Sequence, residues 1–599
     1  MAWYDEAVFY HIYPLGLAGA PKQNDYGEPV HRLNTLLPWV DHIKEIGGSA
    51  LYIGPLFESV GHGYETTDYK KLDSRLGTNE DLAAFVAYCH EQGIKVIFDG
   101  VFNHTGRDFF AFKDIQANRE NSHYKDWYCN VNFWGNNEYN DGFSYDNWGG
   151  YNLLVKLNQK NPAVVDYICD VIRFWVSEFD VDGIRLDAAD VLDFDFMKAL
   201  RRTANEVKPD FWLMGEVIHG DYSRWVNGET LHSVTNYTLH KALYSGHNDH
   251  NYFEIAHTVR RLQNMGTLKL YNFVDNHDVE RIYTKLTNKA HFAPVHVLLY
   301  TLPGVPSIYY GSEFGIEGRK EYGSDDSLRP ALNIEDYKDS VKTNPCTALI
   351  AALGKVRQAV PALSYGSYDE LMLTNRQFAY ARDLDGTRVI VSVNNDDAPA
   401  GMHLAAGNCT AYIGALSGEK VSVQDGHINI TQPANSGEIW VPEGTDLDVK
   451  PVKVVTKTDS EAKTNTEDKA ASETATDAKG NKEAEPKIES KESKDIVTAT
   501  ESADAKKNTT DIEKNTTAAN EVKDSAKDAS AQAAADTPVD PETITVDWSK
   551  SPESMTVPEL QAAILAKLAG NGPVDAQMKK TVTDNIWHDS LVNWLKSFR

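Results

Sequence analysis

Four short segments carry most of the architectural information in this chain: DGVFNH (99–104), DGIRLDAAD (182–190), LMGEV (213–217) and FVDNHD (273–278). Each joins a short apolar run, typical of a buried strand, to an acid at or just after its carboxyl end. In a parallel barrel the carboxyl ends of the strands converge on one mouth. We therefore expect three acids that are distant in sequence, Asp187, Glu216 and Asp278, to meet in space.

Residues 1–360 alternate strand-like runs with amphipathic helical stretches, which is typical of parallel strands and crossover helices. Helical patterns cover Asn79–Gln92 and Pro162–Phe179. Strands are predicted at Val8–Tyr13, Ala50–Gly54, Lys95–Asp99, Gly183–Asp187, Trp212–Glu216, Tyr271–Val274 and Val305–Tyr310. About eight such units over this length predict an α/β fold, a closed (β/α)8 TIM barrel.

One connection is too long for a barrel unit. Almost ninety residues separate the strand ends at Asp99 and Asp187, whereas a strand–helix–strand unit needs only about thirty. The excess is rich in Asn, Gly, Tyr and Trp. We expect residues 1–104 and 158–360 to form the barrel, and residues 105–157 to form an inserted subdomain B beside its mouth.

The chain changes character after the barrel. Alternating runs such as RVIVSVNN predict a C-terminal antiparallel β-sandwich over residues 361–447. Residues 451–540 contain no aromatic, Leu, Met or Cys residue, so we predict a disordered linker that cannot bury enough apolar surface to fold.

Residues 541–599 are expected to form a small helical module. Thr556 and Glu559 have capping-box spacing before a helix. Its apolar face comprises Leu560, Ile564, Leu565 and Leu568, and a second stripe comprises Trp587, Leu591, Trp594, Leu595 and Phe598. Two interpretations stay open: the two faces pack together, or the module docks a protein partner or a glucan.

The formal net charge of −28 argues against nucleic acid or an anionic membrane as a partner and is compatible with a neutral sugar. The five cysteines are scattered, odd in number and without metal-ligand spacing, so we expect free thiols in a reducing compartment. The N-terminus has no basic region followed by an apolar run, and no stretch of about 18 apolar residues exists. These features favour the cytoplasm.

The four segments, together with HGYETTDY (62–69), resemble the signature regions of the α-amylase family of glycoside hydrolases. Two further stretches, VKLNQKNP (155–162) and EVIHGDYSRWVNGETLHSVTNY (216–237), are similar to the neopullulanase, cyclomaltodextrinase and maltogenic amylase group. The resemblance covers residues 1 to about 445.

The resemblance implies a role for each matching residue. Asp187 matches the nucleophile, Glu216 the general acid/base and Asp278 the acid that stabilises the transition state. Arg185 matches the residue that orients the nucleophile and keeps it ionised. The residues implied to bind sugar are Tyr64, His104 and His277 at subsite −1, and Asp325 and Arg329 at subsite −2.

The chemistry of glycoside cleavage supports this pattern independently. One protonated carboxyl must activate the leaving oxygen, and one ionised carboxylate must attack the anomeric carbon. For a retaining enzyme we expect the Asp187 and Glu216 carboxyls to lie about 5–5.5 Å apart. Any one of these acids alone could instead be structural; a salt bridge between Asp187 and Arg185 is such an alternative.

The sequence departs from that group at three points. Ile218 replaces the usual Trp, Asn276 replaces the usual Ser, and the N-terminal β-domain of the group is missing from this sequence. Dimerisation and a preference for cyclodextrins are therefore not implied. No cofactor is required, and a calcium site at Asn103 stays an open alternative with no metal ligands assigned.

We expect a retaining glycosidase that cleaves α-1,4-glucosidic bonds of α-glucan oligosaccharides, namely maltooligosaccharides and starch fragments. Three alternatives remain at this point: a glucanotransferase, a cyclomaltodextrinase or neopullulanase on the same scaffold, and a non-catalytic glucan-binding barrel.

Overall fold

The computed structural model describes residues 2–266, 268–321, 324–449, 451, 546, 548, 550–551, 555–569, 582 and 595. The chain divides into two compact units, residues 1–482 and 483–599. The predicted linker, residues 451–540, lies outside the described residues except for Pro451.

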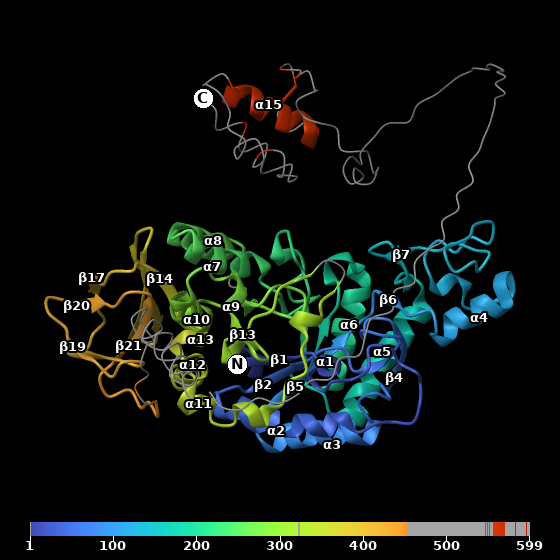
Figure 1. Ribbon diagram of the computed structural model, residues 1–599, viewed down its shortest axis with the longest axis horizontal. Helices are drawn as coiled ribbons and strands as arrows, with labels where there is room; N and C mark the ends of the chain where they lie inside the picture. Colours follow the sequence, from blue (N-terminus) through green and yellow to red (C-terminus); the bar gives the residue numbers. More distant parts are fainter. Residues whose placement is uncertain are drawn as a thin grey trace, which may run out of the picture. The chain divides into compact units, whose positions relative to one another are not determined.

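Eight parallel strands form the centre of the first unit (Figure 1). They are β1 (Phe9–Ile12), β2 (Ala50–Ile53), β5 (Lys95–Gly100), β9 (Gly183–Leu186), β10 (Trp212–Gly215), β11 (Ser233–Val234), β12 (Tyr271–Phe273) and β13 (Val305–Tyr309). The sheet order runs from β11 to β12. A parallel bridge between Thr235 and Tyr271 joins these two edges, and the Asn236 N–H donates to the Tyr271 carbonyl at 2.9 Å. The predicted barrel is confirmed.

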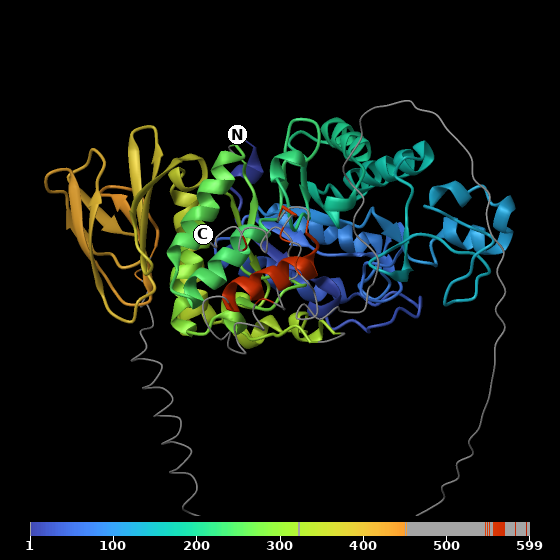
Figure 2. The same cartoon turned by 90° about the horizontal axis from the view of Figure 1, so that it is seen from above.

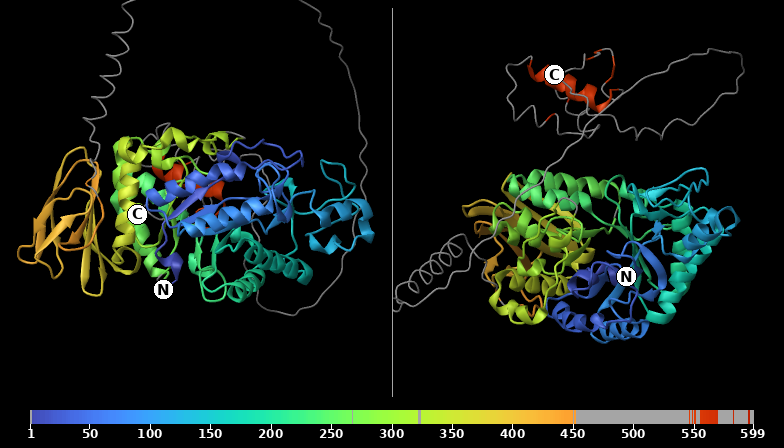
Figure 3. Two further views of the ribbon diagram at one scale, coloured as in Figure 1. Left: turned by 90° about the horizontal axis from the view of Figure 1, so that it is seen from below. Right: turned by 45° about the vertical axis from the view of Figure 1, so that its right-hand side comes forward.

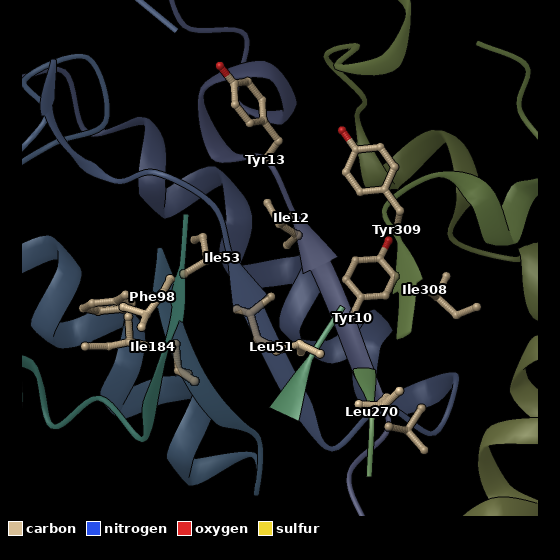
Figure 4. Close-up of a cluster of buried hydrophobic side chains, with 14 of the residues drawn as sticks. Tyr10, Ile12, Tyr13, Leu51, Ile53, Phe98, Ile184, Leu270, Ile308 and Tyr309 are labelled. Carbon is tan, nitrogen blue, oxygen red and sulfur yellow. The ribbon is translucent and has the colours of Figure 1, made fainter. Parts of the chain in front are cut away.

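Side chains alternate between the inside of the barrel and the surrounding helices, because successive residues of a strand point to opposite faces. Inside, large rings fill the space: Phe9 stacks on Trp212 with ring centroids 5.0 Å apart. Outside, Phe98 of β5 contacts Trp175 with centroids 5.9 Å apart. Figure 4 includes members of this outer set on β1, β2, β5 and β9, together with Ile308 of β13. Burial on both faces explains why these strands are apolar throughout.

Helices surround the strands in the views of Figure 3. The principal ones are α2 (Leu37–Glu45), α3 (Asn79–Glu91), α5 (Pro162–Phe179), α6 (Phe194–Val207), α7 (Tyr237–Asn248), α8 (Tyr252–Asn264), α10 (Phe292–Thr301) and α12 (Pro345–Ala359). The two helices predicted from the sequence, α3 and α5, are confirmed. Thr78 and Asp81 form a capping box at the start of α3, and Asn161 caps α5. Among the described residues, no helix is long and apolar enough to cross a membrane.

The long connection after β5 contains its own small fold. It holds β6 (His104–Thr105), α4 (Phe110–Asn118), β7 (Asn147–Trp148) and β8 (Tyr151–Lys156). β8 pairs antiparallel with both β6 and β7. In Figures 1 and 2 this insert lies at the end of the unit opposite to the C-terminal strands.

The C-terminal strands form two antiparallel sheets with a shared apolar core. One sheet has the order β14 (Ser367–Leu373), β15 (Gln377–Leu384), β16 (Thr387–Asn394), β21 (Ser436–Pro442), β18 (Ala411–Gly414) and β19 (Lys420–Ser422), and the other pairs β17 (Ala400–Ala405) with β20 (His427–Gln432). Ile390, Leu404 and Trp440 belong to the core between them. Arg382 donates to the Thr301 carbonyl of α10 at 2.6 Å, which ties this domain to the barrel. The antiparallel domain is confirmed, and the domain limits given above stay predictions.

The described part of the second unit is mainly α15 (Val557–Ala569). The Thr556 N–H donates to Glu559 Oε2 at 2.7 Å, as the capping-box spacing predicts. Leu560, Ile564 and Leu565 are buried. The second predicted stripe lies outside the described residues apart from Leu595, which is buried.

Asp182, just before β9, is a buried carboxylate at the end of the barrel where β9 begins. Its oxygens are contacted by His90 Nε2 at 2.7 Å, Lys95 Nζ at 2.9 Å and Lys208 Nζ at 2.8 Å, and they accept the Val96 N–H at 3.0 Å. Burial raises the pKa of Asp182, but these hydrogen bonds outweigh that effect and hold the pKa well below its usual range. A carboxylate with a depressed pKa stabilises the folded state above its unfolded pKa and loses that contribution as pH falls through the folded pKa.

We expect Asp182→Asn to destabilise the barrel by about 2–3 kcal/mol at pH 7, because a charge-assisted network loses its buried acceptor. The difference from wild type should shrink as the pH is lowered below 4, and calorimetric melting between pH 7 and pH 3 measures it. Asp180→Asn is the matched control, since Asp180 contacts the same Lys208 at 2.7 Å but is 68% exposed. An equal effect of both substitutions at pH 7 would contradict the assigned role of burial.

Candidate active site

Three acids from different strands gather at the carboxyl end of the barrel. Asp187 directly follows β9, Glu216 directly follows β10, and Asp278 lies in the loop after β12. Each acid therefore sits where a short buried strand stops and the chain turns outward, as the sequence predicts.

A single buried arginine joins the acids. Arg185 of β9 is 3% exposed, and its Nη1 lies 2.9 Å from Asp187 Oδ1 while its Nη2 lies 2.8 Å from Glu216 Oε2. Nη1 also lies 2.8 Å from Oδ1 of Asp99, the last acid of β5. The guanidinium thus spans the two carboxyls that the sequence pairs. Their predicted separation of about 5–5.5 Å stays a prediction.

The electrostatics of Asp187 follow from this crowding. Burial raises the pKa of the Asp187 carboxyl well above its usual range, and the neighbouring carboxylates Glu216 and Asp99 raise it further. Arg185 opposes the increase. A group in this position depends on its arginine to ionise, because desolvation alone favours the neutral acid.

Asp278 has the opposite environment. Its carboxylate lies 3.0 Å from His277 Nε2 and 2.8 Å from Arg329 Nη2. Burial raises the pKa of Asp278, but His277, Arg329 and Arg185 together hold it well below its usual range. Asp278 is therefore ionised across the physiological pH range.

Tyr64, His104 and His277 lie together at the same mouth. The Tyr64 ring is nearly parallel to that of His277, with an interplanar angle of 12° and centroids 5.7 Å apart. The Tyr64 hydroxyl donates to Asp99 Oδ2 at 3.2 Å, and the backbone carbonyl of Tyr64 contacts His104 Nε2 at 3.0 Å. Burial lowers the pKa of His104 to about 4, so this ring is neutral at pH 7. The three residues form a connected, buried wall.

Arg329 links the loop after β13 to the acids. It donates to Asp325 Oδ2 at 3.0 Å and to Asp278 Oδ1 at 2.8 Å, and its guanidinium lies 4.7 Å from the centroid of the Tyr13 ring. The ion pair between Asp325 and Arg329 therefore extends to the central carboxylates.

The sequence predicts no role for four residues at this mouth: Asp99, Tyr13, Tyr237, which contacts Glu216, and Asn276, which contacts Tyr237. Asp99 is the first residue of the DGVFNH segment and follows an apolar run, so the sequence pattern could have identified it as a residue of the site. Tyr237 follows β11, whose two residues are too few to show a strand pattern. Its place at the mouth follows only from the closure of the barrel.

A calcium site at Asn103 stays a prediction. Asn103 Oδ1 is buried without a hydrogen-bond partner, and so could serve as one ligand. Calcium takes six to eight oxygen ligands. In the part of the chain that the structure describes, no group of three or more His, Cys, Asp or Glu side chains is placed to hold a metal ion.

Comparisons with known proteins agree with this geometry. A family model for the α-amylase catalytic domain matches residues 32–355. A cyclomaltodextrinase from a Bacillus species is 31% identical over 422 residues, which cover 66% of this chain and 74% of that protein. Neopullulanase 2 of Thermoactinomyces vulgaris is 29% identical and covers 73% of this chain and 78% of its own length. The solved structure of a cyclomaltodextrinase matches with a TM-score of 0.66 at 27% identity, over 73% of this chain and 78% of that one.

Proposed function

The chain belongs to the α-amylase family of glycosidases, and we propose that it hydrolyses α-1,4-glucosidic bonds of maltooligosaccharides and starch fragments with retention of anomeric configuration. The contact of one buried arginine with both Asp187 and Glu216 carries the proposal. This contact supports an assignment in which one carboxyl of the pair is the nucleophile and the other is the acid.

In the first step, Glu216 gives its proton to the glycosidic oxygen as the bond to the anomeric carbon breaks. Asp187 attacks that carbon from the opposite face and forms a covalent glycosyl ester. Arg185 favours the ionised nucleophile before attack. The permanently charged Asp278 stabilises the positive charge that develops on the sugar.

In the second step, Glu216, now ionised, takes a proton from water as the water oxygen attacks the same carbon and releases Asp187. Two inversions give net retention. A sugar hydroxyl can replace water at this stage, so we expect some transglycosylation.

We assign Tyr64, His104 and His277 to the sugar whose bond is cleaved, and Arg329 and Asp325 to the next sugar. Support comes from their contacts: His277 and Arg329 both bind Asp278, while Tyr64 faces His277. The His104 and His277 rings would hydrogen-bond sugar hydroxyls on rearrangement of their present contacts.

A second candidate activity is the cleavage of cyclic maltodextrins or pullulan, or glucanotransfer on the same scaffold. The similarity of this chain to a cyclomaltodextrinase and to neopullulanase 2 favours it. The choice depends on the loops that hold the acceptor. A non-catalytic glucan-binding barrel is disfavoured because all three acids lie together at the mouth.

Product analysis tests the proposal. With maltotriose we expect glucose and maltose, with the new reducing end released first as the α-anomer in a proton NMR time course. Added glucose should increase transfer products at the expense of hydrolysis. Parallel assays on cyclodextrin and pullulan compare the second candidate activity with the cleavage of linear maltooligosaccharides. Release of the β-anomer, or no cleavage of any of these glucans, would overturn the proposal.

We also propose that the protein works in a reducing compartment, the cytoplasm, since its five cysteines are free thiols. The docking of a protein partner or a glucan by residues 541–599 remains a proposal from the sequence.

A further inference from the structure

The Tyr237 hydroxyl lies between Glu216 and a side chain from another strand. It donates to Glu216 Oε1 at 3.4 Å and accepts from Asn276 Nδ2 at 3.2 Å. Tyr237 begins α7 after β11, while Asn276 follows β12. This link therefore crosses the seam at which the barrel closes.

The direction of the hydrogen bonds follows from the surroundings of Asn276. Its Oδ1 accepts the N–H of Asp278 at 2.8 Å and the N–H of Val279 at 3.1 Å. Two backbone donors require the amide oxygen at that position, so the amide NH2 must face Tyr237. The tyrosine oxygen is thereby an acceptor for Asn276, and its own proton is left for Glu216.

The backbone holds Tyr237 firmly. Asn236 caps α7 by accepting the Leu239 N–H, and its amide donates to Asn272 Oδ1 at 2.8 Å. The Tyr237 ring packs edge-on against Phe273 with centroids 4.9 Å apart. Burial raises the pKa of Tyr237 well above its usual range, so the hydroxyl keeps its proton and remains a donor.

Both carboxyl oxygens of Glu216 therefore accept hydrogen bonds. Arg185 Nη2 lies 2.8 Å from Oε2, which also accepts the Ala188 N–H at 3.1 Å. Oε1 faces Tyr237 instead. A carboxyl whose Oε2 is used by two donors must carry its transferable proton on Oε1.

We propose that Tyr237, oriented by Asn276, is a positioning residue that sets the rotation of the Glu216 carboxyl so that Oε1 faces the leaving oxygen. The proposal rests on the proposed role of Glu216 as general acid/base. The backbone N–H of Asp278 holds Asn276 in place. The link therefore also couples the loop that carries Asp278 to the rotation of the Glu216 carboxyl.

The test uses the full-length protein and two substrates that differ in their need for an acid. Tyr237→Phe should lower kcat on maltotriose about 10-fold, a part of the roughly 10²- to 10⁴-fold that a general acid contributes, and leave KM nearly unchanged. On α-maltosyl fluoride, whose fluoride departs without a proton, kcat/KM, which reports the first step alone, should change less than about 2-fold. A purely structural role would affect both substrates alike.

Asn276→Asp is the second variant. It keeps the oxygen that accepts the two backbone N–H groups and replaces the amide donor with an oxygen that attracts the tyrosine proton away from Glu216. The same substrate-dependent loss is expected. Tyr222→Phe is the matched control. The Tyr222 hydroxyl contacts Thr238 of α7 at 2.9 Å rather than the carboxyl of Glu216 or Asp187. It should behave like wild type on both substrates.

Equal losses on both substrates in Tyr237→Phe, or no loss on maltotriose, would overturn the proposal. The proposed function fails differently: wild type would then cleave neither substrate, or Glu216→Gln would lower the rate of the first step equally on both substrates.

Discussion

Asp187→Asn is expected to lose turnover of α-glucosides by more than about 10⁴-fold, as enzymes do when their nucleophile is removed. The amide is nearly the size of the carboxylate and can still accept from Arg185, so the site should stay assembled. It cannot attack the anomeric carbon to form the glycosyl ester. The loss should extend to α-maltosyl fluoride, because a good leaving group does not replace a missing nucleophile.

Initial rates on maltotriose and on α-maltosyl fluoride, with melting temperature as a check of folding, measure this effect. Asp190→Asn is the matched control. Asp190 lies on the turn after β9, and its side chain is exposed. We expect less than a 10-fold change there. If Asp187→Asn turned over substrate at nearly the wild-type rate, a covalent mechanism through Asp187 would be ruled out.

The acids were predictable because each follows a run of apolar residues that burial on both faces demands. Asp187 and Glu216 come directly after β9 and β10, so the ends of these strands coincide with the ends of their hydrophobic runs. Arg185 was recognisable for a related reason, since a charged residue inside a buried strand needs partners. That it has three carboxylate partners was not evident, because Asp99 comes from a strand 86 residues away.

The parts that escaped prediction depend on how the barrel closes. β11 contains only Ser233 and Val234 and has no apolar run to identify it. The bridge between Thr235 and Tyr271 fixes the register at the seam, and this register sets the distance from Tyr237 to Glu216. Polar contacts of this kind follow from the geometry of the closed sheet rather than from local pattern, so composition and periodicity cannot reveal them.

The electrostatic contrast between the acids has the same origin. Asp278 is surrounded by His277 and Arg329, whereas Asp187 shares Arg185 with two other carboxylates. One cation among three carboxylates leaves an excess of negative charge, and a single proton on the pair of Asp187 and Glu216 reduces the repulsion between them. A retaining enzyme needs one proton on this pair at the start of each cycle.

Glu216→Gln is expected to separate the two steps of the reaction. Glutamine can keep the contacts of Oε2 with Arg185 and the Ala188 N–H but has no proton to give. Hydrolysis of maltotriose should fall about 10²- to 10⁴-fold, the usual contribution of a general acid or base. With α-maltosyl fluoride the first step needs no acid and should proceed, whereas the second step lacks its base.

A fluoride electrode should therefore record a burst equal to the enzyme concentration followed by slow turnover, the signature of an accumulating covalent intermediate. Azide should accelerate the slow phase and give the α-glycosyl azide, because an anionic nucleophile needs no base. Wild type, which shows neither burst nor azide acceleration in this scheme, is the control. A β-configured azide would mean direct displacement without a glycosyl ester on Asp187, and it would assign Asp187 to activation of water instead. The configuration of this one product thus decides which of the two carboxyls joined by Arg185 bonds to the sugar.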